Sequence, residues 1–499
     1  MNGTTGSRGI EHVFVLMLEN RSFDHMLGFS YITGTDAATG KPTTTNGLTG
    51  SESNDYGSNT YKVNPGASRV MPADPPHDFP NVLDNFCGPT AKYPKGGPYP
   101  PINNSGFVDS YARSSSVAGA APGEVMKCFG SDQLPVLNAL AREFVICDNW
   151  LASMPGPTWP NRMFLHAASS NGLDHTPSNA ELVEWETFGY GFKNGTIFDR
   201  LKAKGIRRRL YAGDHFPMVA ALKGIGVFDI RPYDDQNHYF VNDLKADSYP
   251  YTYVFIEPSY DVLHEYKAGS SQHPLADVHA GEQLIKTTYD AIRQSKFWNS
   301  SLLIVTYDEH GGFYDHARPS AKAAPPGDTV PGSRYNTYGY AFQDYGPRVP
   351  AIVASPLIPK NLIDHRLYDH ASVPKTLEDL FGMSPMTARD AAAAPLSSLI
   401  TLTTPRTDTP GSMPNPAAMP AMALTARAAV ETPVTRPMDP VDDGILPGAI
   451  HSALHQDLEI SPPAERKAIL ARVGAIKTRG DAMQYLQEVG QKIEKARAQ

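Results

Sequence analysis

The stretch His12-Val13-Phe14-Val15-Leu16-Met17-Leu18-Glu19-Asn20 is an almost unbroken apolar run that ends abruptly in a carboxylate and an amide. Such a run of β-branched, aromatic and aliphatic residues predicts a strand that is buried on both faces. Strands of this kind are typical of parallel sheets covered by helices on both sides. Because ligands of such sheets bind at the carboxyl ends of the strands, Glu19 and Asn20 stand where functional residues are expected.

Five further runs have the same character and alternate with amphipathic stretches. The predicted strands are Phe144–Cys147, Arg209–Ala212, Tyr253–Ile256, Leu302–Tyr307 and Val349–Ala354, and the predicted helices are Asp132–Glu143, Asp277–Gln294 and Ser372–Phe381. Ser131 is the expected cap of the first helix, and Gly382 is the expected C-cap of the third. This alternation predicts an α/β fold with a central, mostly parallel sheet sandwiched by helices.

Composition along the chain predicts three parts. Residues 1–402 form the expected catalytic domain, in which Asp36–Asn104, rich in Thr, Gly, Asn and Pro, predicts long ordered loops over one end of the sheet. Residues 403–446, rich in Pro, Ala and Thr, predict a linker or wrapping arm. Residues 447–499 predict a small helical extension that packs back on the main domain, with two short amphipathic helices within Pro462–Lys495.

Charge and composition exclude several functional classes. The net charge of −8 and the pI near 6.1 leave no basic field for nucleic acid. No apolar run approaches the roughly 18 residues of a transmembrane helix. Met1–Gly9 has neither the charged start nor the apolar core of a signal peptide, so we expect a cytoplasmic protein as written, or a secreted or periplasmic one if a leader was removed. The three cysteines lack the spacing of a disulfide framework or a cysteine zinc site.

A second acidic cluster follows another predicted strand. Leu302–Tyr307 leads directly into Asp308, Glu309 and His310. Adjacent carboxylates at a strand end repel each other unless a cation lies between them. Oxygen ligands of this type suit calcium, magnesium or manganese, and the set can also take zinc. The alternative is that these acids cap the helices that follow.

A third strand end leads into a proline-rich turn. After Cys147 comes Met154–Arg162, in which Pro160 suits the first turn of a helix that continues through Met163–Ala168. Thr158 would then lie near a helix N-terminus, where backbone N–H groups attract phosphate. A metal-activated hydroxyl there could attack phosphorus, whereas the alternative is a threonine that only caps the helix.

The three stretches described above belong to a set of five sequence blocks. This set resembles the bacterial phospholipase C and acid phosphatase A family, and plant non-specific phospholipases C are similar. The matching blocks are Glu19–His25, Pro157–Arg162, Thr306–His316, His273-Pro274 with Asp277-Val278 and Gly281-Glu282, and Gly346–Pro350 followed by Asp369-His370. They follow the family order from about residue 10 to 395. The resemblance implies the fold of the alkaline phosphatase superfamily.

The resemblance also implies a metal site and its nucleophile. Glu19, Asn20, Asp308 and Glu309 would hold one divalent ion, which could be calcium, magnesium, manganese or zinc. Thr158 would be a further ligand and the nucleophile.

Several histidines belong to the matched blocks or lie near them. The resemblance implies a phosphate-site role for His77 and an active-site role for His273. His215 resembles one member of a histidine pair, although its partner is Phe216 in this sequence. The motif histidines that we expect to support the site rather than to act in catalysis are His25, His310 and His316; His370 is a candidate for facing the site.

The activity that the resemblance implies is metal-dependent phosphoester hydrolysis. We expect a phospholipase C that hydrolyses glycerophospholipids, such as phosphatidylcholine, to diacylglycerol and a phosphorylated head group through a phospho-threonine intermediate. The partner would be a phospholipid or small phosphoester, with transient membrane-surface contact and no nucleic acid. Two alternatives stay open: an acid phosphatase acting on phosphomonoesters, and a non-catalytic protein that binds phosphate or lipid head groups.

Overall fold

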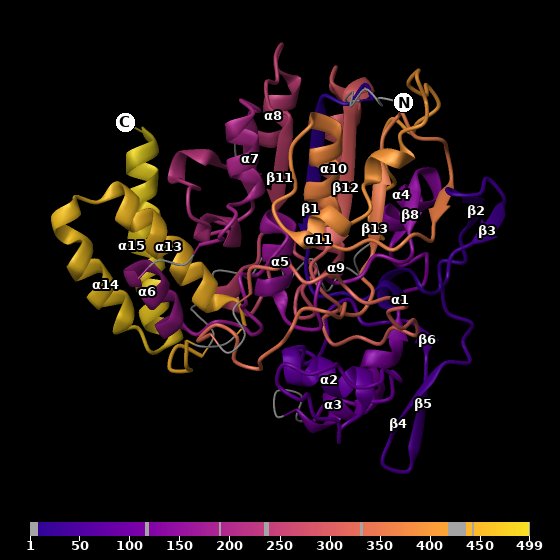
Figure 1. Cartoon of the computed structure of the whole chain (residues 1–499), viewed down its shortest axis with the longest axis horizontal. Coiled ribbons are helices and arrows are strands. Elements are labelled where there is room, and N and C mark those ends of the chain that lie inside the picture. Colours follow the sequence, from indigo (N-terminus) through magenta and orange to yellow (C-terminus); the bar gives the residue numbers. More distant parts are fainter. Residues whose placement is uncertain are drawn as a thin grey trace.

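A ten-stranded sheet forms the centre of the molecule (Figure 1). The computed structural model describes residues 8–114, 119–188, 191–233, 239–329, 333–417, 436–441 and 444–498. In pairing order the strands are β10 (Ile230–Pro232), β9 (Arg208–Ala212), β11 (Tyr253–Glu257), β1 (His12–Leu18), β12 (Ser301–Tyr307), β13 (Ala351–Ala354), β8 (Val145–Cys147), β14 (Leu362–Asp364), β2 (Thr33–Asp36) and β3 (Pro42–Thr44). Among these described strands only β13 and β3 run against their neighbours, which confirms the predicted α/β fold with a mostly parallel sheet.

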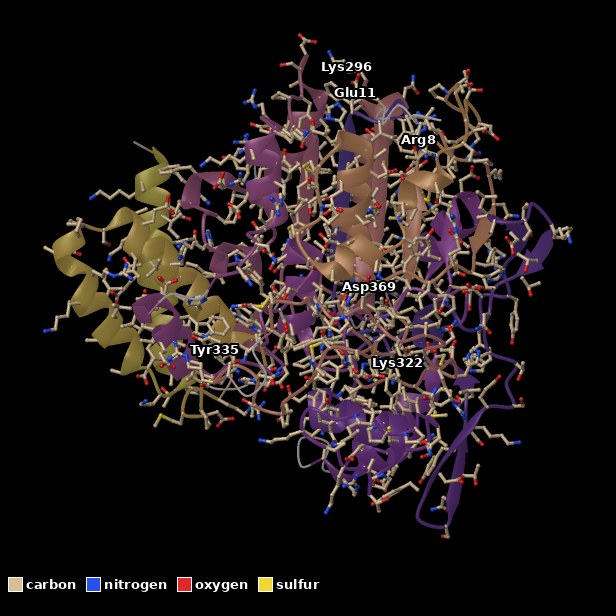
Figure 2. All side chains as sticks on the ribbon, in the orientation of Figure 1. Arg8, Glu11, Lys296, Lys322, Tyr335 and Asp369 are labelled. Carbon is tan, nitrogen blue, oxygen red and sulfur yellow. The ribbon has the colours of Figure 1, made fainter. Side chains whose placement is uncertain are left out.

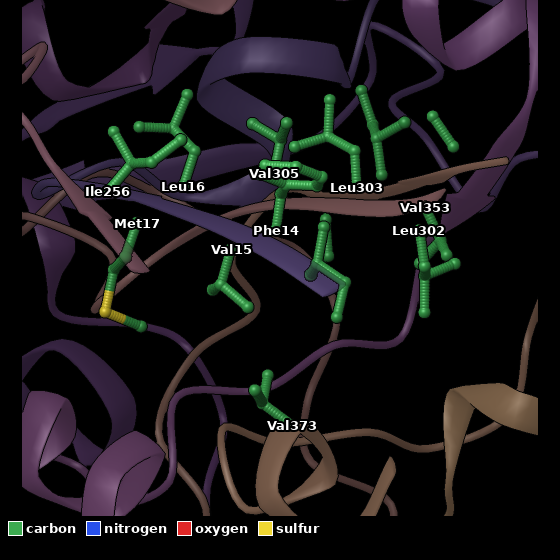
Figure 3. Packing of buried hydrophobic residues seen from close by; sticks show 14 of the residues in the cluster. Phe14, Val15, Leu16, Met17, Ile256, Leu302, Leu303, Val305, Val353 and Val373 are labelled. Atoms are coloured by element: carbon green, nitrogen blue, oxygen red, sulfur yellow. The ribbon is translucent and has the colours of Figure 1, made fainter. Parts of the chain in front are cut away.

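The central strand β1 shows why the apolar runs form this sheet. All seven of its residues are buried. Successive side chains point to opposite faces, so Val15 and Met17 project toward Val373 while Leu16 projects with Val305 to the other side (Figure 3). A strand with an apolar layer above and below has no face to offer to water, and helices must cover both.

The helices form a layer on each face of the sheet (Figure 1). One layer contains α5 (Thr158–Ala167), α7 (Ile197–Ala203), α10 (Ser372–Phe381) and α11 (Ala388–Ala392), and the other contains α4 (Pro135–Glu143), α8 (Tyr239–Lys245) and α9 (Val278–Gln294). The predicted ends of two helices are confirmed: Asp277 caps α9 through a hydrogen bond from the His279 N–H, and Gly382 ends α10 with a φ of 65°.

The start of α4 differs from the prediction. The helix begins at Pro135 rather than at Asp132, and Ser131 is not its cap. Proline is well suited to this first position because it lacks the N–H that the first turn cannot use. The carboxylate of Glu282, from α9, accepts hydrogen bonds from the next two N–H groups, those of Val136 and Leu137, at 2.7 and 2.9 Å. A residue distant in the sequence therefore caps this helix.

The segment Asp36–Asn104 contains more regular structure than the predicted loops. It includes β3, β4 (Ser53–Tyr56), β5 (Asn59–Lys62), β6 (Asn64–Pro65) and α2 (Phe79–Cys87), and it packs against α3 (Phe107–Arg113). Figure 1 shows this layer beyond one end of the strands, as expected. Its apolar residues form a second core that is separate from the core of the sheet.

The C-terminal residues fold into three helices that pack on the main body. They are α13 (Leu446–Ile460), α14 (Arg466–Gly474) and α15 (Arg479–Ala498), so the last is longer than the short helix predicted there. Their apolar side chains enclose Val227 and contact Phe216 and Val262.

The predicted linker is described only in part. Residues 403–417 wrap over α9, where the Pro410 carbonyl accepts a hydrogen bond from the Tyr289 hydroxyl. Residues 418–435 lie outside the described residues. The described helices include none with the length and apolar character needed to cross a membrane.

Candidate active site at the carboxyl ends of β1 and β12

Strand pairing brings the two acidic clusters to one edge of the sheet. β1 and β12 are parallel neighbours in which Leu18 lies opposite Tyr307. Glu19 and Asp308, the next residues of each strand, therefore emerge side by side. Figure 2 shows Glu11 at the end of the molecule where β1 begins and Asp369 near the opposite end of the strands. The predicted site lies at this second end.

The two loops that leave these strands hold each other closely. The Asn20 N–H donates to Asp308 Oδ1 at 2.9 Å, and the Arg21 N–H donates to the Glu309 carbonyl at 2.9 Å. Asn20 adopts a left-handed φ of 55°, and its side chain contacts Thr158 and His77. A side chain at Gly311 would come within 2.1 Å of the Asn20 carbonyl, so only glycine permits this approach.

Two carboxylates of this site have buried oxygens that accept no hydrogen bond. Both oxygens of Glu19, and Oε1 of Glu309, are buried and accept no hydrogen bond within the described residues. Burial, reinforced by the charge of Asp308, raises the pKa of Glu19 well above its ordinary value. Burial likewise raises the pKa of Glu309 to about 7. Buried carboxylate oxygens without a hydrogen-bond donor have the chemistry of ligands for a divalent cation.

The predicted nucleophile lies beside these ligands. Thr158 is the first residue of α5, and its Oγ donates to Asn20 Oδ1 at 3.4 Å. It is 3% exposed, in the first turn of a helix whose N–H groups attract anions. One turn later Arg162 donates to Asp308 Oδ2 at 2.9 Å and to the Leu18 carbonyl at 3.0 Å. The structure thus brings Thr158 together with Asn20 and Asp308.

Two of the predicted histidines belong to this neighbourhood. His77 Nε2 lies 2.8 Å from Asn20 Nδ2 and 3.7 Å from Glu309 Oε1, while its Nδ1 lies 2.7 Å from the Pro75 carbonyl. Burial lowers the pKa of His77, but Glu309 and Asp74 outweigh it and raise the pKa to about 9.

His273 has a different environment. Its ring stacks on Tyr266 with centroids 3.5 Å apart, and its Nε2 lies 3.4 Å from Asp74 Oδ2. The Leu275 N–H donates to its Nδ1 at 3.2 Å. His273 therefore faces Asp74, which is in turn beside His77.

The other motif histidines take positions around the ligands. His310 Nδ1 lies 3.2 Å from Glu309 Oε2, and His370 Nε2 contacts the Asp308 carbonyl. His25 stacks on Phe313, with centroids 3.7 Å apart. His215 lies elsewhere, in a cavity of about 520 Å³ that the C-terminal helices help to line.

A second group with metal-ligand chemistry lies behind the first. Within the described residues, Asp24, Asp315 and His316 place ligand atoms within 4.8 Å of one another. The guanidinium of Arg348 already fills this group, because it donates to Asp24 Oδ1 at 2.9 Å and to Asp315 Oδ1 at 2.8 Å. Its fixed positive charge takes the place that a cation would need. In the part of the chain that the structure describes, the side chains of Glu19, Asp308 and Glu309 do not form a group of this closeness.

Sequence reasoning did not assign the roles of Arg162 and Asp74. Arg162 stood within a matched block, and its spacing of four residues from Thr158 places both on one face of a helix. Asp74 lies in the loop-rich segment and could not have been found from its own spacing. Arg162 pairs with the carboxylate of Asp308, and the carboxylate of Asp74 lies beside the imidazole of His273.

A cavity of about 710 Å³ opens over His77 and Asp74, and the C-terminal segment helps to line it. The lining includes Arg436, Leu446 and Arg479. At the start of α13, Gly448 packs directly on Trp159, the neighbour of Thr158; a methyl group on Gly448 would lie 2.2 Å from the Trp159 ring. The C-terminal helices are therefore in contact with the active-site helix.

This contact leads to a stability prediction. We expect Gly448→Ala to destabilise the protein by about 1–3 kcal/mol, because the added methyl group overpacks a rigid indole. We expect activity to fall as well, because Trp159 follows Thr158 directly in the first turn of α5. Thermal denaturation and initial rates measure the two effects. Gly474→Ala, at a position with open space around it, is the matched control, and equal behaviour of both variants would contradict the prediction.

Comparison with known proteins finds relatives over most of the chain. The model of the Phosphoesterase family matches residues 10–384. Non-specific phospholipase C6 of Arabidopsis thaliana is 35% identical over 429 residues, which cover 82% of this chain and 76% of the relative. Non-specific phospholipase C3 of the same plant is 32% identical over 428 residues, covering 83% and 77%. Phospholipase C A of Mycobacterium tuberculosis is 27% identical over 449 residues, covering 82% and 80%.

Proposed function

Because this chain belongs to the Phosphoesterase family and is a phosphoric ester hydrolase, we propose that it is a metal-dependent phospholipase C with Thr158 as its nucleophile. One observation carries the proposal: the Thr158 hydroxyl donates to Asn20, at the sheet edge where both oxygens of Glu19 and Oε1 of Glu309 are buried without a hydrogen bond. A hydroxyl, a neutral amide and buried oxygen ligands at one helix N-terminus form a site for a phosphoryl group.

The ligands of the proposed metal are Glu19, Asn20, Asp308 and Glu309, with Thr158 as the fifth. A divalent ion bound there would neutralise the phosphoryl oxygens and lower the pKa of the Thr158 hydroxyl. Arg162 holds Asp308 in position through its 2.9 Å hydrogen bond. With its hydroxyl proton lost to solvent, Thr158 attacks phosphorus in line and the bond from phosphorus to the diacylglycerol oxygen breaks. The result is a phospho-threonine that carries the head group, and water then hydrolyses it to release the phosphorylated head group.

We assign the general acid to His77 rather than to His273. The Nδ1 of His77 lies beside the Pro75 carbonyl, and its Nε2 lies 2.8 Å from Asn20 Nδ2 and 3.7 Å from Glu309 Oε1, next to the proposed metal ligands. A proton on Nε2 would replace the hydrogen bond from Asn20 and would be available to the leaving alkoxide.

His273 faces Asp74 rather than the proposed metal ligands, since its Nδ1 accepts the Leu275 N–H and its Nε2 lies 3.4 Å from Asp74 Oδ2. His273 orients Asp74, and Asp74 in turn supports the charge of His77. We assign no step to His215.

Two observations support a phospholipid as substrate. The relatives described above are named phospholipases C, and a lipid or phosphoester substrate follows from them. The cavity over His77 has room beyond that needed for a phosphate group, and its lining combines apolar Leu446 and Met71 with cationic Lys267 and Arg436. Such a lining suits a phosphate with a glycerolipid attached.

The test compares two substrates on the same protein. With a divalent metal present, we expect higher kcat/KM for phosphatidylcholine in mixed micelles than for p-nitrophenyl phosphate, with diacylglycerol and phosphocholine as products. An adduct on Thr158, found by mass spectrometry after acid quenching, would support the covalent step: phosphocholine with phosphatidylcholine as substrate, and phosphate with the monoester. Faster hydrolysis of the monoester would favour the acid phosphatase alternative. Phosphate binding without turnover of either substrate would favour the binding protein.

A further inference from the structure

A small buried cavity lies beside the active-site helix α5. Its volume is about 20 Å³, and every residue that lines it is buried. Three of the lining residues are ionisable: Arg162 and His166, which are four residues apart on α5, and Glu257, the last residue of β11. Because a spacing of four residues places Arg162 and His166 on one face of the helix, this face and the end of β11 bound the cavity together.

One nitrogen of Arg162 lacks an acceptor. Its Nε donates to Asp308 Oδ2 at 2.9 Å and its Nη2 donates to the Leu18 carbonyl at 3.0 Å. Its Nη1 is buried and donates no hydrogen bond within the described residues. The guanidinium carbon lies 5.3 Å from the centroid of the Tyr260 ring, which covers one side of the group. A buried N–H group of a charged side chain is stable only when an acceptor is close to it.

The imidazole of His166 has a free nitrogen of the same kind. His166 is 4% exposed, and in the described part of the chain its Nδ1 is buried without a hydrogen bond. Burial, with the charge of Arg162, lowers the pKa of His166 to about 3, so the ring is neutral. A neutral imidazole either donates or accepts a hydrogen bond at Nδ1, according to its tautomer.

Glu257 brings a carboxylate to the third side of the cavity. Its Oε1 accepts the Tyr260 hydroxyl at 2.9 Å, and its Oε2 accepts the Val219 N–H at 3.1 Å. Burial raises the pKa of Glu257, and the charge of Arg162 acts against this effect. Nevertheless, no ion pair joins Arg162 to Glu257 among the residues that the structure describes. A guanidinium and a carboxylate that line one cavity without direct contact are well placed to share a water.

The size and charges of the cavity select one kind of ligand. A volume of about 10–15 Å³ is enough for a single water, which also needs two to four polar partners. The guanidinium of Arg162 repels a cation, and the carboxylate of Glu257 repels an anion. A water molecule is neutral and both donates and accepts hydrogen bonds, so it can satisfy all three side chains.

We propose that one buried water bridges Arg162 Nη1, His166 Nδ1 and the Glu257 carboxylate, and that His166 and Glu257 are positioning residues for Asp308. The water holds the third nitrogen of Arg162, so the guanidinium keeps one orientation and presents its Nε to Asp308 Oδ2. The water itself is independent of the reaction. Its effect on metal binding rests on the proposed function, in which Asp308 is a metal ligand; groups that orient a ligand from behind contribute to metal affinity.

A crystal structure of the full-length protein, at a resolution that places waters, tests the water directly. We expect a density peak within about 2.7–3.2 Å of Arg162 Nη1, His166 Nδ1 and a Glu257 oxygen. In His166→Phe, which keeps an aromatic ring but loses the nitrogen, the water should be absent and Arg162 should no longer contact Asp308 in one orientation. A wild-type cavity without density, or a direct contact between Arg162 and Glu257 that closes it, would overturn the proposal. If His166→Phe does not fold, the wild-type map decides.

Metal titration by calorimetry tests the positioning role. We expect the Kd for manganese to rise about tenfold in His166→Phe, and His166→Asn, whose amide can replace Nδ1, to recover most of the affinity. His279→Phe is the matched control: His279 is 6% exposed, and its Nδ1 also lacks a hydrogen bond in the described residues, but it lies on α9 in the other helix layer. Equal affinity of His166→Phe and this control would overturn the positioning role. A wild type that binds no divalent metal would instead contradict the proposed function, and the density map would then decide the water.

Discussion

Replacing Thr158 with alanine should reduce kcat by on the order of 10⁵-fold while the protein stays folded. The substitution removes one hydroxyl and one methyl group from the first position of α5, where alanine is accommodated without strain. The hydrogen bond that is lost, to Asn20 at 3.4 Å, is long and contributes little to stability. Initial rates with phosphatidylcholine and with a chromogenic monoester measure the effect.

Two variants make this result specific. Thr158→Ser keeps a hydroxyl at the same position and should keep measurable activity together with the covalent adduct. Thr187→Ala removes an exposed threonine of α6 (Asn179–Phe188) and should leave the rate unchanged. Activity of purified Thr158→Ala within tenfold of wild type would exclude Thr158 as nucleophile, and the site would then have to activate water directly.

Replacing Glu19 with glutamine should change activity and stability in opposite directions. Loss of a ligand charge should lower kcat/KM about 100-fold or more and weaken metal binding. In the metal-free protein the same substitution should raise the free energy of unfolding by about 1–3 kcal/mol, because wild type buries a carboxylate without a partner. Calorimetry with and without a chelator, beside steady-state rates, measures both.

The pH dependence of the metal-free protein follows from the same carboxylates. Folding raises the pKa of Glu309 from 4.5 to about 7, so the folded protein holds this proton more tightly than the unfolded chain. The stability that protonation provides is complete below pH 4.5 and is lost as the pH rises toward 7. Glu19, whose pKa burial raises in the same direction, adds to this loss. Glu19→Gln should reduce this slope, and bound metal should abolish it.

Glu282→Gln is the control for the loss of a buried carboxylate. Glu282 is also buried, but it accepts two N–H groups at the start of α4. Its replacement should lower stability with or without metal and leave the metal requirement unchanged. If Glu19→Gln, like Glu282→Gln, lowers the free energy of unfolding in the presence of chelator, Glu19 is structural and not a metal ligand.

Local sequence patterns predicted six strands of the sheet but missed β2, β3, β10 and β14, and they predicted the loop-rich segment poorly. The six apolar runs are all strands because a strand buried on both faces needs a continuous apolar stretch, which is visible in the sequence. The helix α2 was not predicted, because the many prolines and glycines of Asp36–Asn104 indicate loops. Its apolar residues pack on a second core made by distant segments. The start of α4 was misplaced for a related reason, since its cap, Glu282, comes from another helix.

The sequence alone placed carboxylates directly after two buried strands and a threonine beside a helix start, because each is a relation between neighbours in the chain. Only the folded chain made β1 and β12 adjacent in register, so that Glu19 and Asp308 share one sheet edge. It also set Arg162 against Asp308, Asp74 against His273 and Gly448 against Trp159. These contacts join segments far apart in the sequence, and packing of the whole core determines them, which no local pattern records.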